Sequence, residues 1–161
     1  MDLAMLKKRI HFSDSGFMLI ELIAAITILL VLTTLALPLA RNSIIRARET
    51  RLHEDLRTIR EAIDRYKFDS DQGRIPIKVD TMGYPPDLQT LVDGVPMKGT
   101  VKGKYKYLRR IPIDPMTGSA DWGLRAMQDD PDSKSWGGEN VFDVYSKGQG
   151  TALDGTQYGD W

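Results

Sequence analysis

Carboxylates are the side chains of this 161-residue chain that are best suited to chemistry, and three groups of them stand out. Glu21 is the one charged residue of an apolar stretch, Asp129–Asp132 is an acidic cluster, and Asp154 and Asp160 belong to a glycine-rich tail. Carboxylates serve as acids and bases, as metal ligands, or as partners for a buried cation. No nucleophile or apolar pocket is visible beside Asp129–Asp132, so we interpret that cluster as a solvated loop.

Composition removes several classes of function. The chain has no cysteine, which excludes disulfides and thiolate metal sites, and its two histidines, His11 and His53, lie far from the acidic cluster. Lys and Arg together number 22, as do Asp and Glu, so the neutral net charge predicts no binding to nucleic acid. No catalytic motif or phosphate-binding glycine loop is found, and we predict that the protein is not an enzyme.

Glu21 lies in the most informative segment, Phe17–Ala40, in which it is the only charge among 24 residues. A helix of this length spans the roughly 30 Å hydrocarbon core of a membrane. Three basic residues at positions 7–9 precede it and favour a cytoplasmic N-terminus, with the remaining chain on the far side. The segment therefore predicts a single-pass transmembrane helix. Pro38 is expected to kink or locally open it near its end.

Three ordinary interpretations of Phe17–Ala40 compete, before the residues around Gly16 are considered. A cleaved secretory signal is typically shorter and ends in a small-X-small cleavage site. A cut at Ala40 would place Pro38 at position −3, where a small residue is expected. A plain signal anchor for a periplasmic enzyme or binding domain explains the length but not Glu21, since a carboxylate in a membrane helix costs roughly 2.5–3.5 kcal/mol. A buried core helix is the third, but few apolar residues remain elsewhere to surround it.

Residues 16–21 read Gly-Phe-Met-Leu-Ile-Glu, which resembles the processing motif of type IV prepilins and type II secretion pseudopilins. The resemblance implies that a prepilin peptidase cuts after Gly16 and that the new amine of Phe17 is methylated. The family usually has Thr where this chain has Met18, a mild substitution. Glycine before the scissile bond leaves the backbone free to enter a tight cleft.

The same resemblance gives Glu21 a role in assembly. It would be the fifth residue of the mature chain, about one helical turn from the new amine. An unpaired charge is costly in a low-dielectric setting, so we hypothesise that Glu21 pairs with the amine of a neighbouring subunit and fixes the stagger between copies. The family also has a proline at the position of Pro38, where the helix is thought to loosen during assembly.

After Arg41 the helical pattern continues with charged residues on one face. An apolar stripe at helical spacing predicts a helix from about Phe17 to about Phe68, amphipathic over residues 41–70. The stripe consists of Ile45, Leu52, Leu56, Ile59, Ile63 and Tyr66. The expected shape is a lollipop, in which a membrane helix continues into a helix packed against a small head.

The remaining residues predict a small α+β head. A short helix is expected at Leu88–Val92, capped near Asp87. Strands are expected at Tyr105–Leu108, Trp122–Met127 and Val141–Tyr145. The predicted fold is a type IV pilin-like α+β fold, with the long N-terminal helix on a small antiparallel sheet and a long C-terminal loop. The predicted domains are a leader at 1–16, a transmembrane helix at 17–40 and a periplasmic head at 41–161.

A narrower resemblance involves segments of the head. Tyr84-Pro85, the run Tyr107–Pro115, the run Phe142–Ser146 and Trp161 are similar to the G-type, or major, pseudopilin of type II secretion. This resemblance implies that copies of the chain are held in the bacterial inner membrane and then polymerise into a periplasmic filament. The implied partners are the prepilin peptidase, the minor pseudopilins and the assembly platform. A surface type IV pilin for adhesion or motility is the alternative, although many such pilins carry a cysteine pair that is absent here.

G-type pseudopilins bind one calcium ion in the C-terminal loop, and the resemblance implies such a site in residues 146–161. Asp154 and Asp160 are the candidate ligands, with carbonyls and hydroxyls supplying further oxygens. The chain departs from the family pattern, since Gly150 and Thr156-Gln157 stand near positions where acids are usual. The alternative is that Asp154 and the following glycine form a tight turn.

Overall fold

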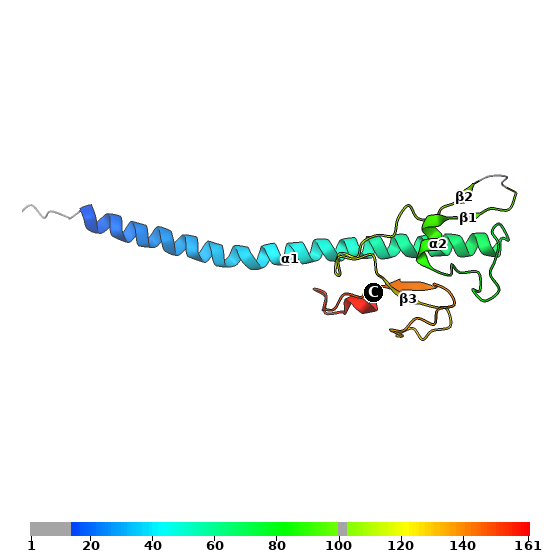
Figure 1. The fold of residues 1–161 in the computed structure, drawn as a ribbon. Helices are drawn as coiled ribbons and strands as arrows, with labels where there is room; N and C mark the ends of the chain where they lie inside the picture. The colour runs from blue at the N-terminus through cyan, green and yellow to red at the C-terminus, as the bar shows by residue number, and fades with distance from the viewer. Residues whose placement is uncertain (1–13, 100–102) are drawn as a thin grey trace, which may run out of the picture. The chain divides into compact units, whose positions relative to one another are not determined.

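The computed structural model describes residues 14–99 and 103–161, with the backbone alone for residues 14–17 and 35–40. Most of the predicted leader, Met1–Gly16, thus lies outside the described residues. The chain divides into two compact units, Met1–Ser43 and Ile44–Trp161. The described residues form two α-helices, four short strands and a 3-10 helix (Figure 1).

Helix α1 runs from Asp14 to Asp71 (Figure 1), which confirms the predicted long helix from Phe17 to Phe68. In the first unit, the side chains from Met18 to Thr34 are all exposed, most of them apolar. Among the residues that the structure describes, no helix meets the length and apolarity needed to cross a membrane.

In the second unit, the predicted stripe of α1 forms one side of the hydrophobic core. Five of its six residues are at most 6% exposed, whereas Ile45 is 36% exposed. The five are Leu52, Leu56, Ile59, Ile63 and Tyr66, and the side chains opposite them include Ile75, Leu91, Trp122, Val141 and Val144. Full burial of one such side chain contributes about 1.5–3 kcal/mol, so this stripe is the main link between the helix and the rest of the unit.

A glycine two residues beyond Asp71 terminates helix α1. Gly73 adopts a left-handed conformation with φ of 65°, and its N–H donates to the carbonyl of Ser70 at 2.9 Å. The N–H of Arg74 donates to the carbonyl of Asp69 at 2.9 Å. Glycine tolerates this conformation without strain, and the two bonds satisfy carbonyls that the helix end leaves open.

Helix α2, Leu88–Asp93, confirms the predicted short helix and its cap. The Asp87 carboxylate accepts from the Thr90 N–H at 2.6 Å and from the Thr90 hydroxyl at 2.9 Å. Such a cap satisfies a backbone donor that the first turn leaves open. Leu88 and Leu91 point into the core.

The strands form two small antiparallel sheets instead of one. Strand β1 (Val95–Pro96) pairs with β2 (Lys104–Tyr105), and β3 (Gly123–Arg125) pairs with β4 (Asp143–Tyr145). Strand β1 was not predicted, and the three predicted strands are shorter than expected because neighbouring N–H groups bond outside the ladders. Those of Tyr107 and Leu108 both donate to the Leu91 carbonyl, and that of Val141 donates to the Pro85 carbonyl.

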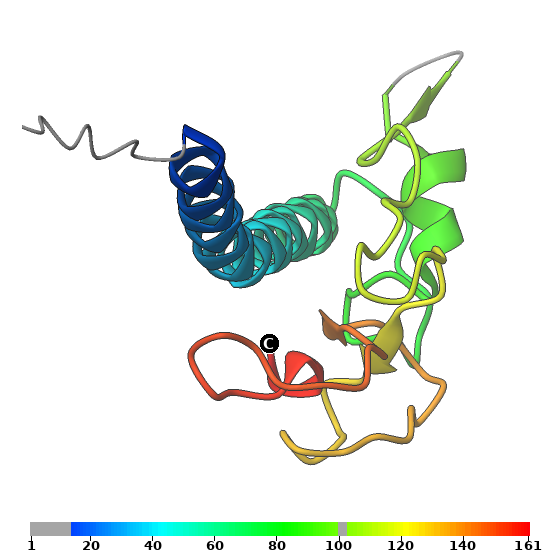
Figure 2. The same ribbon diagram turned by 90° about the vertical axis from the view of Figure 1, so that its left-hand side faces the viewer.

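The second unit is therefore an α+β arrangement around the C-terminal part of α1. Figure 2 shows the segments after α1 curving around one side of this helix, from α2 to the C-terminal segment. The last element is the 3-10 helix η1, Tyr158–Asp160. The predicted α+β combination of a long helix with antiparallel strands is confirmed, whereas the prediction of a single sheet is wrong.

Candidate functional site

The predicted processing and assembly residues all lie in the first unit. Gly16 and Phe17 are in the first turn of α1, Glu21 follows one turn later, and Pro38 lies further along the same helix. The Glu21 side chain is exposed and forms no ion pair or hydrogen bond with any described residue. Cleavage, methylation and intersubunit pairing therefore stay predictions.

A second candidate site is the C-terminal loop, Ser146–Trp161, together with the α1 side chains that hold it. Glu49 of α1 is only 9% exposed. One of its oxygens, Oε1, accepts from the Leu153 N–H at 2.9 Å and from the Tyr158 hydroxyl at 3.1 Å. Burial first, and then the hydrogen bond to Glu49, raise the pKa of the Tyr158 hydroxyl. Glu49 thus joins the helix to both halves of the loop.

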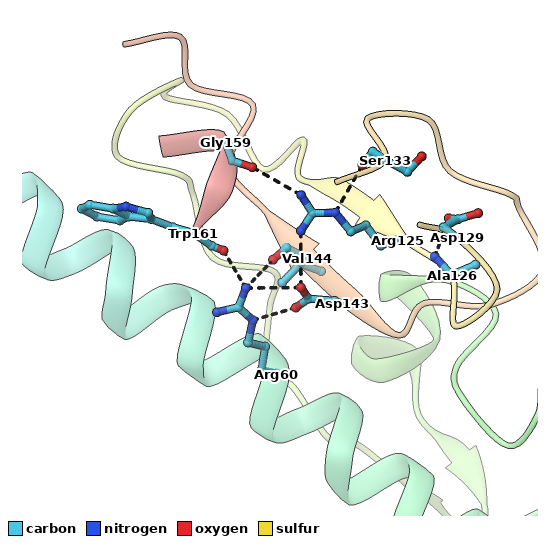
Figure 3. Close-up of polar contacts among 9 residues, drawn as sticks. All are labelled: Arg60, Arg125, Ala126, Asp129, Ser133, Asp143, Val144, Gly159 and Trp161. Carbon is cyan, nitrogen blue, oxygen red and sulfur yellow. Dashed lines mark hydrogen bonds and ion pairs between the residues drawn. The ribbon is translucent and has the colours of Figure 1, made fainter. Parts of the chain in front are cut away.

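Arg60 of α1 joins two further segments, strand β4 and the C-terminal loop (Figure 3). Its Nε donates to Asp143 Oδ1 at 2.7 Å, and its Nη2 donates to the carbonyl of Val144 at 3.0 Å and to the backbone oxygen of Trp161 at 2.6 Å. A guanidinium has five donors in a planar fork, and here one fork serves a strand and the C-terminal loop together.

Asp143 lies between two arginines (Figure 3). Its second oxygen, Oδ2, is 3.5 Å from Nη1 of Arg125, which comes from the paired strand β3. The Arg125 guanidinium also lies over the Tyr145 ring at 4.3 Å and donates to the carbonyl of Ser133 at 3.2 Å. This network connects α1, the β3–β4 sheet and the loop that joins those strands.

Trp161 packs on α1 through its ring. Its indole stacks on the His53 imidazole with 4.0 Å between centroids and an angle of 14°. Its Nε1 donates to Thr156 Oγ1 at 2.7 Å, and Tyr158 meets it edge-on at 5.4 Å. His53 is exposed and contributes this structural contact.

The run Arg109–Pro115 contributes a fully buried carboxylate, that of Asp114. Asp114 accepts from the Ser146 hydroxyl and from the Met116 N–H, both at 2.7 Å. Ser146 is also fully buried, and its hydroxyl oxygen accepts from the Gly148 N–H at 2.9 Å. This chain of bonds ties the run to the first residues of the C-terminal loop.

The candidate calcium ligands are exposed and are used differently. Asp154 Oδ1 accepts from the Thr156 N–H at 2.9 Å and from its hydroxyl at 2.7 Å, the geometry of a tight turn. These two bonds lower the pKa of Asp154, the side-chain bond being the larger cause. Asp160 lies in η1. Within residues 14–99 and 103–161, no three acidic or histidine side chains meet in a group that could hold a metal.

The acidic cluster Asp129–Asp132 forms a loop, as predicted. Asp129 Oδ2 accepts from the Ala126 N–H at 2.7 Å and from the Gly137 N–H at 3.1 Å, while Asp130 and Asp132 are exposed. The carboxylate therefore shapes its own loop.

Sequence reasoning overlooked Glu49, although the pattern contains a signal for it. Two neighbouring members of the stripe, Ile45 and Leu52, are seven residues apart. Glu49 lies between them at helical spacing, four residues after Ile45 and three before Leu52. A charged residue at a buried position of a helix needs a partner. The partners, Leu153 and Tyr158, lie more than 100 residues away, and no local pattern points to them.

Two curated proteins match nearly the whole chain. The type II secretion system core protein G of Pseudomonas aeruginosa is 28% identical over 158 residues, which cover 92% of this chain and 95% of that protein. The protein of the same name from Klebsiella michiganensis is 28% identical over 156 residues, which cover 92% of this chain and 94% of that protein. Neither a protein-family model nor a solved structure matches the chain.

These matches confirm the resemblance that the motifs at residues 16–21 and 107–115 predict. They start from a different kind of observation, because they extend along the chain instead of resting on a few short motifs. Over nearly its whole length, the chain is similar to the type II secretion system core protein G.

Proposed function

We propose that this protein is a structural subunit of a type II secretion pseudopilus. The observation that carries the proposal is the match to two core G proteins of type II secretion over 92% of the chain. The long helix α1 followed by a small α+β unit supports it, because such a chain can contribute one helix to a filament and one head to its surface.

The proposed maturation begins at the N-terminus. A prepilin peptidase cuts the peptide bond after Gly16, which releases the basic leader, and the free amine of Phe17 is then methylated. The motif at residues 16–21 supports this step, because it combines a glycine before the cut with an apolar residue after it. The stretch Phe17–Ala40, with its single charge, then holds the subunit in the inner membrane with its head in the periplasm.

The proposed filament is a helical homopolymer whose interior is the apolar part of α1. The side chains from Met18 to Thr34 are exposed in the single chain, and neighbouring copies would cover them. Glu21 then pairs with the amine of a neighbour, and Pro38 loosens the helix as the subunit leaves the membrane. Minor pseudopilins and the inner-membrane platform are the other partners, and growth of the filament helps to move proteins across the outer membrane.

Filament assembly tests this proposal. The full chain is expressed in a bacterium that has a type II secretion system but lacks its own core G protein, and filaments sheared from the cells are detected by immunoblot and electron microscopy. We expect filaments from the wild type and none from Glu21→Ala. Glu54→Ala, which removes an exposed carboxylate from the second unit, is the matched control and should assemble normally.

The alternatives predict other results. A signal-anchored periplasmic domain would keep its leader and form no filament, although the host's core G protein, restored from a plasmid, assembles under the same conditions. A surface pilin would form filaments even after the secretion platform is deleted, provided that a pilus platform is present. Either result would contradict the proposed function.

A further inference from the structure

The resemblance to G-type pseudopilins implies a calcium ion in the C-terminal loop, and the donors of this loop can be tested against that requirement. Calcium takes six to eight oxygen ligands, several of them carboxylates. The only carboxylate side chains of the loop are those of Asp154 and Asp160, and both are exposed. Asp154 already accepts two hydrogen bonds from Thr156 in a turn of its own. Two exposed carboxylates, one of them engaged in its own turn, do not fit the ligand set of a calcium site.

The hydroxyls of Ser146 and Thr156, the two side chains that could add oxygen ligands, are also engaged. Ser146 Oγ donates to Asp114 and accepts from the Gly148 N–H. Thr156 Oγ1 donates to Asp154 and accepts from the Trp161 indole. Both hydroxyls thus already act as donor and acceptor within the protein, and each bond fixes the loop's own backbone or side chains.

The loop meets α1 with groups of the opposite polarity. The atoms that converge on Glu49 are the N–H of Leu153 and the hydroxyl of Tyr158, at 2.9 and 3.1 Å from the same carboxylate oxygen. A cation gathers oxygens around itself, whereas a carboxylate gathers donors. The loop therefore presents donors at the place where it is fastened, and the helix supplies the charge.

Backbone bonds within the loop bring these two donors together. The Ala152 N–H donates to the Thr156 carbonyl at 2.8 Å, and the Gly155 N–H donates to the Ala152 carbonyl at 3.0 Å. Thr151 and Gln157 pair as an isolated antiparallel bridge on either side of this turn. Leu153 and Tyr158 are thereby placed on the same carboxylate although they are five residues apart.

Two more α1 residues complete the attachment. His53 stacks on the Trp161 indole, and Arg60 donates to the Trp161 backbone oxygen at 2.6 Å. Glu49, His53 and Arg60 are spaced four and seven residues apart, so they share one face of the helix. That face receives one donor pair, one aromatic ring and one acceptor from the loop.

We propose that the C-terminal loop is closed by this face of α1, with Glu49 as its central anchor, and that closure requires no calcium ion. Negative charge from the helix replaces positive charge from a metal, and the loop has exchanged acids for residues that donate hydrogen bonds or turn the backbone. The inference goes beyond the proposed function, because it concerns how the head folds and not how copies assemble.

Hydrogen exchange at Leu153 tests the anchor, using the full chain in detergent micelles and mass spectrometry of peptides that cover the loop. Glu49→Ala removes the acceptor of the Leu153 N–H, so exchange there should be faster by at least about tenfold. Glu54→Ala is the control from the same helix and should exchange like the wild type. Unchanged exchange in Glu49→Ala would overturn the proposal.

A milder variant and a metal titration complete the test. If Glu49→Ala fails to fold by circular dichroism, Tyr158→Phe removes a single hydroxyl and should still speed exchange at Leu153 about two- to tenfold. The wild-type melting temperature should agree within about 1 °C between excess calcium and excess chelator, because a ligand stabilises only the state that it binds. A rise of several degrees with calcium, or unchanged exchange in Tyr158→Phe, would overturn the proposal. Neither readout depends on filament formation.

Discussion

Arg60 Nε donates to Asp143 Oδ1 at 2.7 Å, although the two residues are 83 positions apart in the chain. The same guanidinium reaches the backbone oxygen of Trp161, 101 positions away. Helix α1, strand β4 and the C-terminal loop are thus joined at one side chain. Both charged groups are partly exposed, at 39% for Arg60 and 26% for Asp143, so solvent weakens the ion pair, and the hydrogen bonds to backbone carbonyls add to its effect.

Arg60→Ala should lower the free energy of unfolding by about 1–2 kcal/mol, because it removes a charged donor from three acceptors. Arg60→Lys should recover only part of this loss, since an ammonium lacks the planar fork. Urea unfolding followed by tryptophan fluorescence measures the change, as all three tryptophans lie in the second unit. Arg57→Ala is the matched control, because Arg57 is 80% exposed and pairs with Glu61 on the helix surface. Equal losses in Arg60→Ala and Arg57→Ala would contradict the account.

Asp114→Ala should destabilise the protein by about 2–4 kcal/mol, because it leaves the buried Ser146 hydroxyl and the Met116 N–H without their acceptor. Asp114→Asn keeps one acceptor oxygen and should cost less. The control is Asp121→Ala, which removes a surface ion pair with Lys147 and should cost under about 1 kcal/mol. The same urea experiment gives all three values. A loss for Asp114→Ala no larger than that for Asp121→Ala would show that the buried bonds are unimportant.

Stability should fall at alkaline pH because of Tyr107. Burial first, and then the hydrogen bond to Asp69, raise the pKa of its hydroxyl above the ordinary value of 10.0. In the unfolded chain the hydroxyl ionises near the ordinary value, so its contribution is complete below about pH 10 and is lost as the pH rises from there toward the folded pKa. The slope for one such group approaches about 1.4 kcal/mol per pH unit.

Urea midpoints between pH 9 and 11 on the wild type and Tyr107→Phe check this dependence on pH. The variant should be less stable at neutral pH and should lose stability less steeply as the pH rises. Tyr105→Phe changes an exposed neighbouring ring, and it should keep the wild-type slope. Parallel curves for the wild type and Tyr107→Phe would contradict the role given to Tyr107.

Much of the fold could be predicted because its signals are local. The apolar stripe of α1 follows helical spacing, and Asp87 precedes an apolar segment at the position where a capping residue belongs. The two separate sheets could not be predicted in this way. Tyr107 and Leu108 have strand-like side chains, but their N–H groups bond to Leu91, a partner that only the tertiary structure brings near.

The contacts of the C-terminal loop show the same limit. Asp154 could be interpreted from its neighbours, since an aspartate before a glycine predicts a tight turn. Its alternative role as a calcium ligand came from resemblance alone. Glu49 was visible as a charge within a buried stripe, but its partners lie over 100 residues away and depend on the whole fold. The roles proposed for Gly16, Phe17 and Glu21 involve other proteins, and a single chain does not contain those partners.

The central claim is that the chain matures as a prepilin, and the mass of the protein extracted from membranes tests it most directly. The account predicts loss of residues 1–16 together with the addition of one methyl group at Phe17. Gly16→Ala examined in parallel should show less processing, because a side chain then enters the cleft before the scissile bond. An intact N-terminus on the wild-type protein, in cells whose own prepilins are processed, would contradict the account.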